Sequence, residues 1–430
     1  MRNKRLITLL GSICLILVLA ALPFMAACPA PPAEEEEAPP AEEEEVPPVP
    51  EEEVYKWPGF FKVFGPSVTY STYLLTVAWT PLHERDTGTK WRIVPESSSP
   101  LGARWLKIGE MDFWATGTTV VIGPTEATFG YATRDGGPFP IRMVWQGDVG
   151  CGGIAVRGDS RIKTFADIKP GTKISIWIGA HTLMQLYQAF CAWLQMTEDE
   201  LIMVPCATNT AAERAILEGK ADITYLSSTG TTAYEIASSA HGLRYLALPE
   251  DPEAEARYHE VAPQAMFGMV DFGVEEFYGV RGQIVPRGYF TSADVIDEET
   301  AYQLAKWLYE NFDAYKDLYK EAPRMSLEYF RKTLDQTYAP VHEGTIRYLK
   351  EIGQWTSADD ARQEYNVRLQ NWYIEAYEDA LAMADEKGIK VDPVNEEWVE
   401  LWENYKKEIG IPRLSVMSDE EIAAGLAKLK

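Results

Sequence analysis

Two stretches of this chain repeat one pattern: Trp105-Leu-Lys-Ile-Gly109-Glu-Met-Asp112-Phe-Trp-Ala-Thr-Gly117 and Ala215-Ile-Leu-Glu-Gly219-Lys-Ala-Asp222-Ile-Thr-Tyr-Leu-Ser227. In each, an amphipathic helix ends at a glycine suited to the left-handed conformation, an aspartate follows, and a short apolar run ends in Ser, Thr or Gly. The pattern predicts a helix, a tight turn and a buried strand. Such units occur in many α/β proteins, but two copies 110 residues apart favour two α/β lobes of similar plan. In such sheets a ligand lies beyond the carboxyl ends of the strands.

The N-terminus predicts export. Arg2, Lys4 and Arg5 precede an apolar run over residues 6–27 that ends at Cys28. The residues before Cys28 resemble a bacterial lipobox, which implies removal of residues 1–27 and a lipid anchor on Cys28. The alternative is an uncleaved membrane anchor, because about 20 apolar residues span a bilayer. Both interpretations predict a chain that is tethered to the cell membrane and faces the periplasm or the outside.

The segment after Cys28 is strongly biased in composition. Residues 29–53 contain only Pro, Ala, Glu and Val, so residues 28–55 are expected to form a disordered, extended spacer. The chain has a net charge of −25, which becomes −28 without the leader's three cations and −17 without the spacer's eleven glutamates. A body this acidic argues against nucleic acid as a partner.

Three cysteines remain in the body: Cys151, Cys191 and Cys206. Two alternatives stay open, a disulfide between Cys191 and Cys206 or buried free thiols. The sequence contains no Gly-x-Ser-x-Gly elbow, no His-Glu-x-x-His helix and no His/Cys cluster, so we expect no metal, no cofactor and no enzyme activity. A carboxylate-pair glycosidase is not excluded by spacing among 65 acidic residues, although no pair stands out.

Polar loops follow several predicted strands and precede helices, at residues 65–72, 96–100, 178–182 and 227–232. Such residues are often simple N-caps. The same helix starts also bind anions through their N–H groups, so we expect them to hold a ligand, with neighbouring aromatic residues as an apolar wall. The candidate ligand-binding residues are Ser67, Thr69, Tyr70, Ser97, Ser98, Ser99, Trp114, Trp177, Gly179, Ala180, His181, Thr182, Ser227, Ser228, Thr231 and Tyr234.

His181 is the sharpest of these candidates. It follows the probable strand at residues 173–178 and precedes a helix that extends to about Trp193. Its ordinary pKa lies close to working pH, so it is suited to donate to a ligand carboxylate. The alternative is a loop histidine that faces water.

The C-terminal half is expected to be helical after a long extended segment at residues 282–295. Helices are predicted at residues 298–319, 326–334, 344–352, 358–387 and 395–409, and Ser418 to Glu421 forms a capping box. We interpret His342 as structural, fixing the turn before its helix. The tryptophans of this region, at 355, 372, 398 and 402, are expected to be packing residues.

Four segments together resemble the TAXI family of solute-binding proteins of TRAP transporters. They are Asp167–Ile176, Ile178–Thr182, Leu217–Asp222 and, most specifically, Ala339–Tyr348 with its Pro-x-His-x-Gly motif. The resemblance spans roughly residues 60–353. It implies a periplasmic-binding-protein-like type II fold, in which two α/β lobes close around a small organic acid and deliver it to the small and large TRAP membrane subunits.

This resemblance also divides the chain. The expected parts are a signal peptide (1–27), the spacer (28–55), lobe 1 (56–148), lobe 2 with hinge strands (149–290), lobe 1 return helices (291–355) and a C-terminal helical extension (356–430). The extension either braces the first lobe or forms a dimer contact. The resemblance implies that the organic acid is a dicarboxylate, an oxoacid or an amino acid such as glutamate. The loops at Pro66–Thr69 and Gly179–Thr182 depart from the family's glycine-rich stretches, so the alternative is a ligand that differs from these. A ligand-sensing module for a membrane receptor is the alternative function, and a secreted hydrolase the weaker one.

Overall fold

A computed structural model describes residues 55–65, 67–95 and 98–429. The predicted signal peptide, Cys28, the spacer through residue 54 and the candidate Ser97 lie outside the described residues. From Tyr55 onward the chain forms one compact unit. A search of the described part finds no helix with the length and apolar character needed to cross a membrane.

In the described part of the chain, ten strands form one mixed sheet, whose main path runs β2-β1-β3-β10-β4-β7-β5-β6. The first three strands are parallel at one end of the path, and β7, β5 and β6 are parallel at the other. Their bounds are β1 Phe60–Gly65, β2 Lys90–Pro95, β3 Phe113–Gly117, β4 Ile141–Arg157, β5 Lys173–Trp177, β6 Ile202–Cys206, β7 Ile223–Ser227, β8 Leu243–Tyr245, β9 Met266–Gly268 and β10 Gly282–Ser292.

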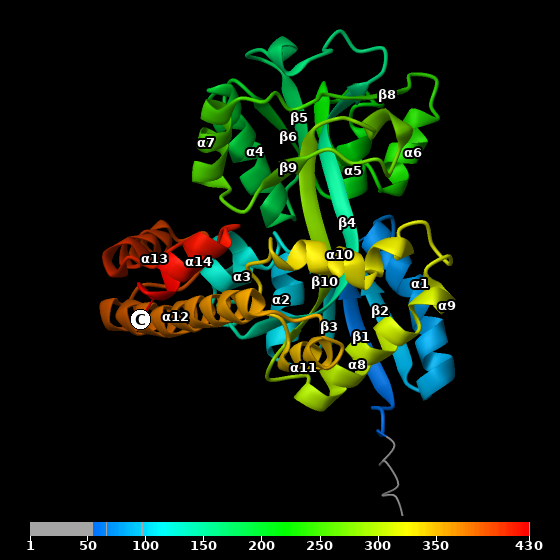
Figure 1. The fold of residues 1–430 in the computed structure, drawn as a ribbon. Coiled ribbons are helices and arrows are strands. Elements are labelled where there is room, and N and C mark those ends of the chain that lie inside the picture. The colour runs from blue at the N-terminus through cyan, green and yellow to red at the C-terminus, as the bar shows by residue number, and fades with distance from the viewer. Residues whose placement is uncertain (1–54, 66, 96–97, 430) are drawn as a thin grey trace, which may run out of the picture. The chain divides into compact units, whose positions relative to one another are not determined.

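Two long antiparallel strands, β4 and β10, connect the two groups of parallel strands (Figure 1). Lobe 1 contains β1–β3, and lobe 2 contains β5–β7 with the short strands β8 and β9. Helices of lobe 1 are α1 Ser71–Thr87, α2 Ser99–Lys107, α3 Ile122–Glu126, α8 Glu298–Glu310, α9 Phe312–Tyr315, α10 Leu327–Leu334 and α11 Glu343–Glu351. Helices of lobe 2 are α4 His181–Leu194, α5 Asn209–Arg214, α6 Thr231–Ala237 and α7 Pro252–Val261.

The two repeated units have the same turn. Gly109 and Gly219 adopt positive φ angles of 74° and 67°. The aspartate that follows each glycine accepts a hydrogen bond from a strand N–H of the neighbouring β-strand, Asp112 from Lys62 at 2.6 Å and Asp222 from Lys173 at 2.9 Å. Each aspartate N–H also donates to the carbonyl oxygen of that same lysine. The predicted two-lobed α/β fold is therefore confirmed, with corresponding turns in both lobes.

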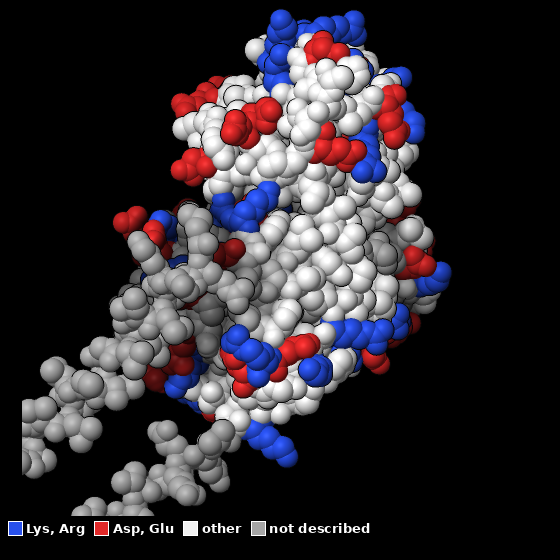
Figure 2. All heavy atoms as spheres, turned by 90° about the vertical axis from the view of Figure 1, so that its right-hand side faces the viewer, with Lys and Arg blue, Asp and Glu red and all other residues white. Residues whose placement is uncertain are grey.

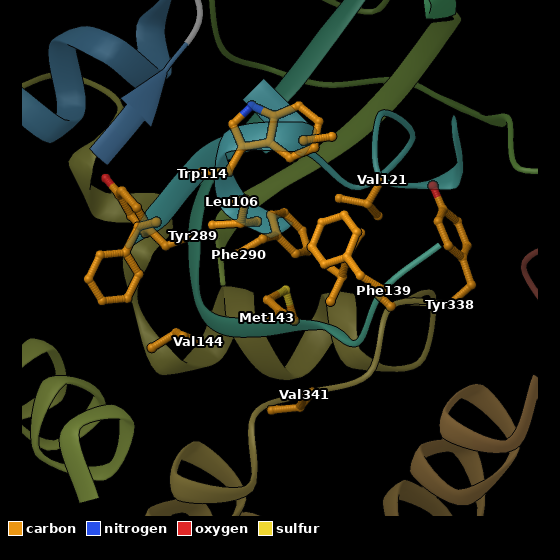
Figure 3. Close-up of a cluster of buried hydrophobic side chains, with 14 of the residues drawn as sticks. Leu106, Trp114, Val121, Phe139, Met143, Val144, Tyr289, Phe290, Tyr338 and Val341 are labelled. Carbon is orange, nitrogen blue, oxygen red and sulfur yellow. The ribbon is translucent and has the colours of Figure 1, made fainter. Parts of the chain in front are cut away.

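The buried apolar side chains follow this division. One cluster joins lobe 1 to the C-terminal helices, and two smaller clusters fill lobe 2. Figure 3 shows part of the lobe 1 cluster, where Trp114 of β3 lies among Leu106, Phe290 and other core residues. Over the face drawn in Figure 2, acidic and basic side chains are interspersed and form no basic stripe.

The C-terminal extension packs on lobe 1. Its helices are α12 Ser357–Lys387, α13 Glu396–Ile409 and α14 Asp419–Leu426, and the last begins with the predicted capping box at Ser418. Trp398 donates to the carbonyl of Ala132 at 2.8 Å, and Trp402 donates to that of Ala127 at 3.1 Å. Both indoles are buried, as predicted. The extension therefore braces lobe 1 within this chain.

His342 has the structural role expected of it. It is the N-cap of α11, where its Nδ1 accepts from the N–H of Gly344 at 3.2 Å. Its other ring nitrogen lies 3.0 Å from the carbonyl oxygen of Ile296. The imidazole thus joins the start of α11 to the turn before α8.

Several predictions of local structure need correction. The strand expected at residues 152–157 is the end of β4, which begins at Ile141 because tertiary burial overrides the polar and glycine-rich segment Gln146–Gly153. The helix expected over residues 298–319 ends at Glu310 and is followed by the separate α9. Of the two alternatives left open for the cysteines, the structure has free thiols, because Cys191 and Cys206 do not form a disulfide and Cys151 is also free. Helix α7 and strands β8 and β9 were not anticipated.

Candidate functional site

A cavity of about 120 Å³ lies where strands and helices of both lobes meet. This is space for several water molecules or one small organic molecule. Its lining is mainly hydroxyl, amide and apolar groups. The lining residues are Tyr70, Thr72, Ser99, Thr116, Gly117, Thr119, Val120, Cys151, Trp177, Ala180, Thr182, Leu183, Gln185, Leu186, Tyr225, Ser227, Tyr258, Ala262, Gln264, Gln283, Val285 and Arg287.

Arg287 is the single charged residue of this lining in the described part of the chain. It lies on β10 where the pairing with β4 shifts register, between Pro286 and Gly288. A β-bulge of this kind bends a strand and redirects a side chain. The side chain of Arg287 is only 9% exposed, so the bulge places a guanidinium inside the protein at the cavity wall.

The positive charge of Arg287 is compensated by a fully buried carboxylate, that of Asp148. Nη1 of Arg287 donates to Oδ2 of Asp148 at 2.9 Å and to Oγ of Ser71 at 2.7 Å. Asp148 also accepts hydrogen bonds from Ser71 and, at 2.9 Å, from Thr72. Burial alone would lower the pKa of Arg287, but the neighbouring Asp148 carboxylate raises it above its usual value.

The second terminal nitrogen of the guanidinium, Nη2, is less fully hydrogen-bonded than Nη1. Nη2 of Arg287 has one long hydrogen bond, to Oγ of Ser227 at 3.4 Å. Asp148 does not line the cavity, whereas Arg287 does. The arrangement therefore presents N–H donors and positive charge to the cavity, with the compensating carboxylate behind them.

The two lobes touch around the cavity. The N–H of Thr231 donates to the carbonyl oxygen of Thr69 at 3.3 Å, and the hydroxyls of Ser71 and Thr229 lie 3.3 Å apart. Lys320 of lobe 1 also lies over the ring of Tyr234 in lobe 2, with its Nζ 3.3 Å from the ring centre. A molecule inside the cavity is thus enclosed by both lobes.

Six of the predicted site residues line the cavity. They lie at strand ends and helix starts of both lobes, as the strand-end rule requires. The six are Tyr70, Ser99, Trp177, Ala180, Thr182 and Ser227.

The other predicted residues lie elsewhere. Trp114 is in the lobe 1 core, and Ser228 is fully buried with its hydroxyl 2.7 Å from the thiol of Cys151. Thr69, Thr231 and Tyr234 take part in the contacts between the lobes described above. Ser67, Ser98 and Gly179 are also outside the lining, although each is next to or near a residue that belongs to it.

His181 needs the clearest correction. It is the first residue of α4, but its side chain is outside the lining although both neighbours are within it. The imidazole packs against Phe129 of lobe 1, with ring centres 3.7 Å apart and ring planes tilted by 36°, and it meets Tyr131 edge-on at 5.9 Å. Burial lowers the pKa of His181 to about 4. This histidine is therefore a neutral packing residue between the lobes. Its side chain faces Phe129 and Tyr131, which are too distant in sequence for this contact to be predicted.

Sequence reasoning missed several lining residues. The run Thr116-Gly-Thr-Thr119 begins at the end of the first repeated unit, and the strand-end rule that selected Ser227 would also have selected it. Arg287 gave no such signal, because it lies inside a segment interpreted as a hinge strand. Gln185 and Gln264 were missed because one is mid-helix and the other follows the unpredicted α7.

Within the described residues, no group of His, Cys, Asp and Glu side chains is arranged to hold a metal ion. The candidate site therefore offers a ligand the hydroxyl, amide and apolar side chains of its lining and the guanidinium of Arg287.

A model of the NMT1-like family matches residues 125–353, which is more than half of the chain. The chain belongs to the NMT1-like family. In this NMT1-like protein the matched region contains lobe 2, both long strands and the return helices of lobe 1, and it ends before the extension. No curated protein matches the chain.

Solved structures resemble this NMT1-like protein only loosely. One is the alkanesulfonate-binding protein SsuA from Xanthomonas axonopodis pv. citri bound to MOPS, 15% identical with a TM-score of 0.38, covering 72% of this chain and 94% of that one. A structure titled as a periplasmic transporter is 14% identical with a TM-score of 0.43, covering 77% and 98%. The GluR0 ligand-binding core from Nostoc punctiforme in complex with L-glutamate is 13% identical with a TM-score of 0.37, covering 60% and 97%.

Proposed function

We propose that this NMT1-like protein is an extracytoplasmic solute-binding protein that captures a small organic acid between its two lobes. The observation that supports this most directly is Arg287, a buried guanidinium. Among the described residues it is the single charged group in the lining of the cavity between the lobes. A planar guanidinium donates two parallel hydrogen bonds to a carboxylate or sulfonate, and such charge-assisted bonds are stronger than neutral ones.

Capture works through closure of the lobes. The cavity lining combines Thr116 and Thr119 of lobe 1 with Thr182 and Tyr258 of lobe 2, so only a closed protein presents all of these groups together. A ligand shifts the equilibrium toward closure by the difference between its affinities for the closed and open states. The contacts between Thr69 and Thr231 form part of that closed state.

Delivery to a membrane transporter is the second part of the proposal. The TAXI resemblance of the Pro340-Val-His342-Glu-Gly344 segment supports the small and large TRAP membrane subunits as partners. The apolar leader and Cys28 support a lipid anchor, and the Pro/Glu-rich spacer would separate the folded body from the membrane surface. The proposal assigns no reaction to the protein.

A ligand screen tests the capture step. Small organic acids that bind the folded protein should raise its melting temperature in proportion to ln(1 + [L]/Kd). Removing only Arg287 would leave Asp148 buried and unpaired, so the informative variant replaces both, Asp148→Asn with Arg287→Gln. We expect this double variant to fold and to lose acid binding.

Two results would contradict the proposal. One is the absence of stabilisation by any small acid in the unmodified protein. The other is an acid that binds the double variant as tightly as the unmodified protein. Transport itself is tested by reconstituting TRAP membrane subunits with the protein in vesicles and measuring uptake of the acid that the screen identifies.

A further inference from the structure

Two buried amides form a second polar part of the cavity lining. Gln185 lies on α4, and Gln264 lies three residues after the end of α7. Both line the cavity together with Tyr258 and Ala262, and the exposed fractions of the two glutamines are 6% and 4%. All four residues belong to lobe 2, whereas Arg287 lies on the long strand β10.

The backbone of α7 fixes which way these amides face. Nε2 of Gln185 donates to the carbonyl oxygen of Val261 at 2.9 Å. Reversing this amide would put two oxygen atoms against each other, so Oε1 of Gln185 must face the other way. There it accepts from Nε2 of Gln264 at 2.7 Å. The orientation of Gln264 is therefore determined by Val261 through Gln185.

This chain of hydrogen bonds leaves one acceptor unused. Oε1 of Gln264 is buried and has no hydrogen-bond partner within the described residues. Native proteins seldom leave a buried polar atom unpaired, because the atom has lost its bonds to water without replacement. Gln264 lines the cavity, so a group bound there is in a position to supply the missing N–H or O–H.

The charge of the cavity sets a further condition on the ligand. Arg287 is its single charged lining group in the described part of the chain, and Asp148 already compensates that charge from behind. A second carboxylate on the ligand would be buried without a cation, which is costly. The lining therefore suits one acidic group, a small apolar body and hydrogen-bonding substituents.

We infer that Gln264 is a specificity-determining residue that accepts a hydrogen bond from the ligand. This inference rests on the proposed function and narrows it. The ligand has one acidic group and carries a hydroxyl group or a protonated amino group as the donor. The cavity excludes dicarboxylates and acids without a donor. Arg287 holds the acidic group, and Gln264 distinguishes the substituent.

The test compares matched acids on the unmodified protein by calorimetry. Each set has one carbon skeleton: the unsubstituted monocarboxylate, its 2-hydroxy, 2-amino and 2-oxo derivatives, and the dicarboxylate of equal length. We expect a hydroxy or amino acid to bind about tenfold or more tightly than the unsubstituted and oxo acids, as expected for loss of a buried hydrogen bond.

Variants assign that preference to one side chain. Gln264→Met keeps the length of the side chain but removes the acceptor, so we expect it to abolish the preference while unsubstituted acids bind as before. Gln188→Met is the matched control, because Gln188 lies on the same helix as Gln185 but outside the cavity lining, and it should keep the preference.

The outcomes separate this inference from the function on which it rests. If no acid of any set binds, the proposed capture of an organic acid is wrong, and the role of Gln264 is wrong with it. If acids bind but oxo, unsubstituted or dicarboxylic acids bind as tightly as donor-bearing ones, only the role of Gln264 is overturned. That second comparison uses the unmodified protein and does not depend on a variant that folds.

Discussion

Replacing His181 by Phe should change how the stability of this protein depends on pH. In the folded protein His181 is 9% exposed and packs against Phe129, and burial lowers its pKa to about 4 from the ordinary value of 6.5. No charged group contributes to this shift. Phenylalanine preserves the aromatic contact between the lobes and removes the titration.

The sign and size of the effect follow from the two pKa values. Between pH 6.5 and 4 the unfolded chain binds a proton at His181 that the folded protein does not. The free energy of unfolding therefore falls as the pH falls through this window and is level above it. A difference of about 2.5 pKa units at 1.36 kcal/mol each gives about 3 kcal/mol from this one residue.

Other groups titrate in the same window, so the difference between variant and unmodified protein is the quantity to measure. Burial also lowers the pKa of His83 to about 4, and this residue contributes with the same sign. Burial raises the pKa of Glu213 to about 7, which makes stability fall as the pH rises from 4.5. These contributions cancel when the two proteins are compared at each pH.

The assay is urea unfolding of the unmodified protein and His181→Phe at several values from pH 4 to 7.5. We expect the stability of the variant relative to the unmodified protein to increase by about 3 kcal/mol between pH 7.5 and pH 4. His83→Phe is the parallel variant in lobe 1 and should show a similar change. An unchanged difference across this pH range for His181→Phe would refute the assignment of His181 as a buried neutral residue.

Four further substitutions test other parts of the structure. Asp148→Asn leaves Arg287 buried without its carboxylate and should lower the free energy of unfolding by about 3–5 kcal/mol, measured by urea unfolding at pH 7. Glu213→Gln should remove a loss of about 3 kcal/mol that the unmodified protein shows between pH 4.5 and 7, measured by the same pH series. Trp402→Ala should cost about 3–5 kcal/mol and expose the extension to limited proteolysis, because this buried indole packs on lobe 1. Arg413→Ala should cost more than the about 1 kcal/mol of an exposed ion pair, up to about 3 kcal/mol in urea unfolding, because it leaves the carboxylate of Glu126, which is 2% exposed, without this cation.

Local signals in the sequence were sufficient for the repeated units. Gly109 and Gly219 have positive φ angles, and each following aspartate bonds to the adjacent strand, so a pattern of a few residues determines the whole turn. The capping box at Ser418 is local in the same way. Features formed by neighbouring residues were therefore predictable from one sequence.

The central parts of the site depend on residues far apart in the chain. Arg287 meets Asp148 across a β-bulge, and neither the bulge nor the pairing leaves a sequence pattern. His181 was placed correctly at the start of a helix but is turned toward Phe129, which lies 52 residues earlier. Helix position was predictable for this histidine, whereas the direction of its side chain was decided by packing between the lobes.

The C-terminal extension forms hydrogen bonds to both lobes. Buried Glu126 of lobe 1 accepts from the N–H of Leu414 at 2.7 Å, while Nη1 of Arg413 donates to the carbonyl oxygens of Glu260 at 3.2 Å and Val261 at 3.4 Å. The last two carbonyls belong to the end of α7 in lobe 2, where a cation is also favoured by the helix dipole.

Opening the lobes must break the bonds from Arg413 if α7 moves away from the extension. Val261 also orients Gln185, so the residue that the extension contacts is part of the chain of hydrogen bonds that leads to the cavity. The matched family region ends at residue 353, before the extension begins. In the proposed capture by lobe closure, a segment outside that region thus contributes to the energy of the closed state, and the affinity for a ligand includes this contribution as well as the contacts made inside the cavity.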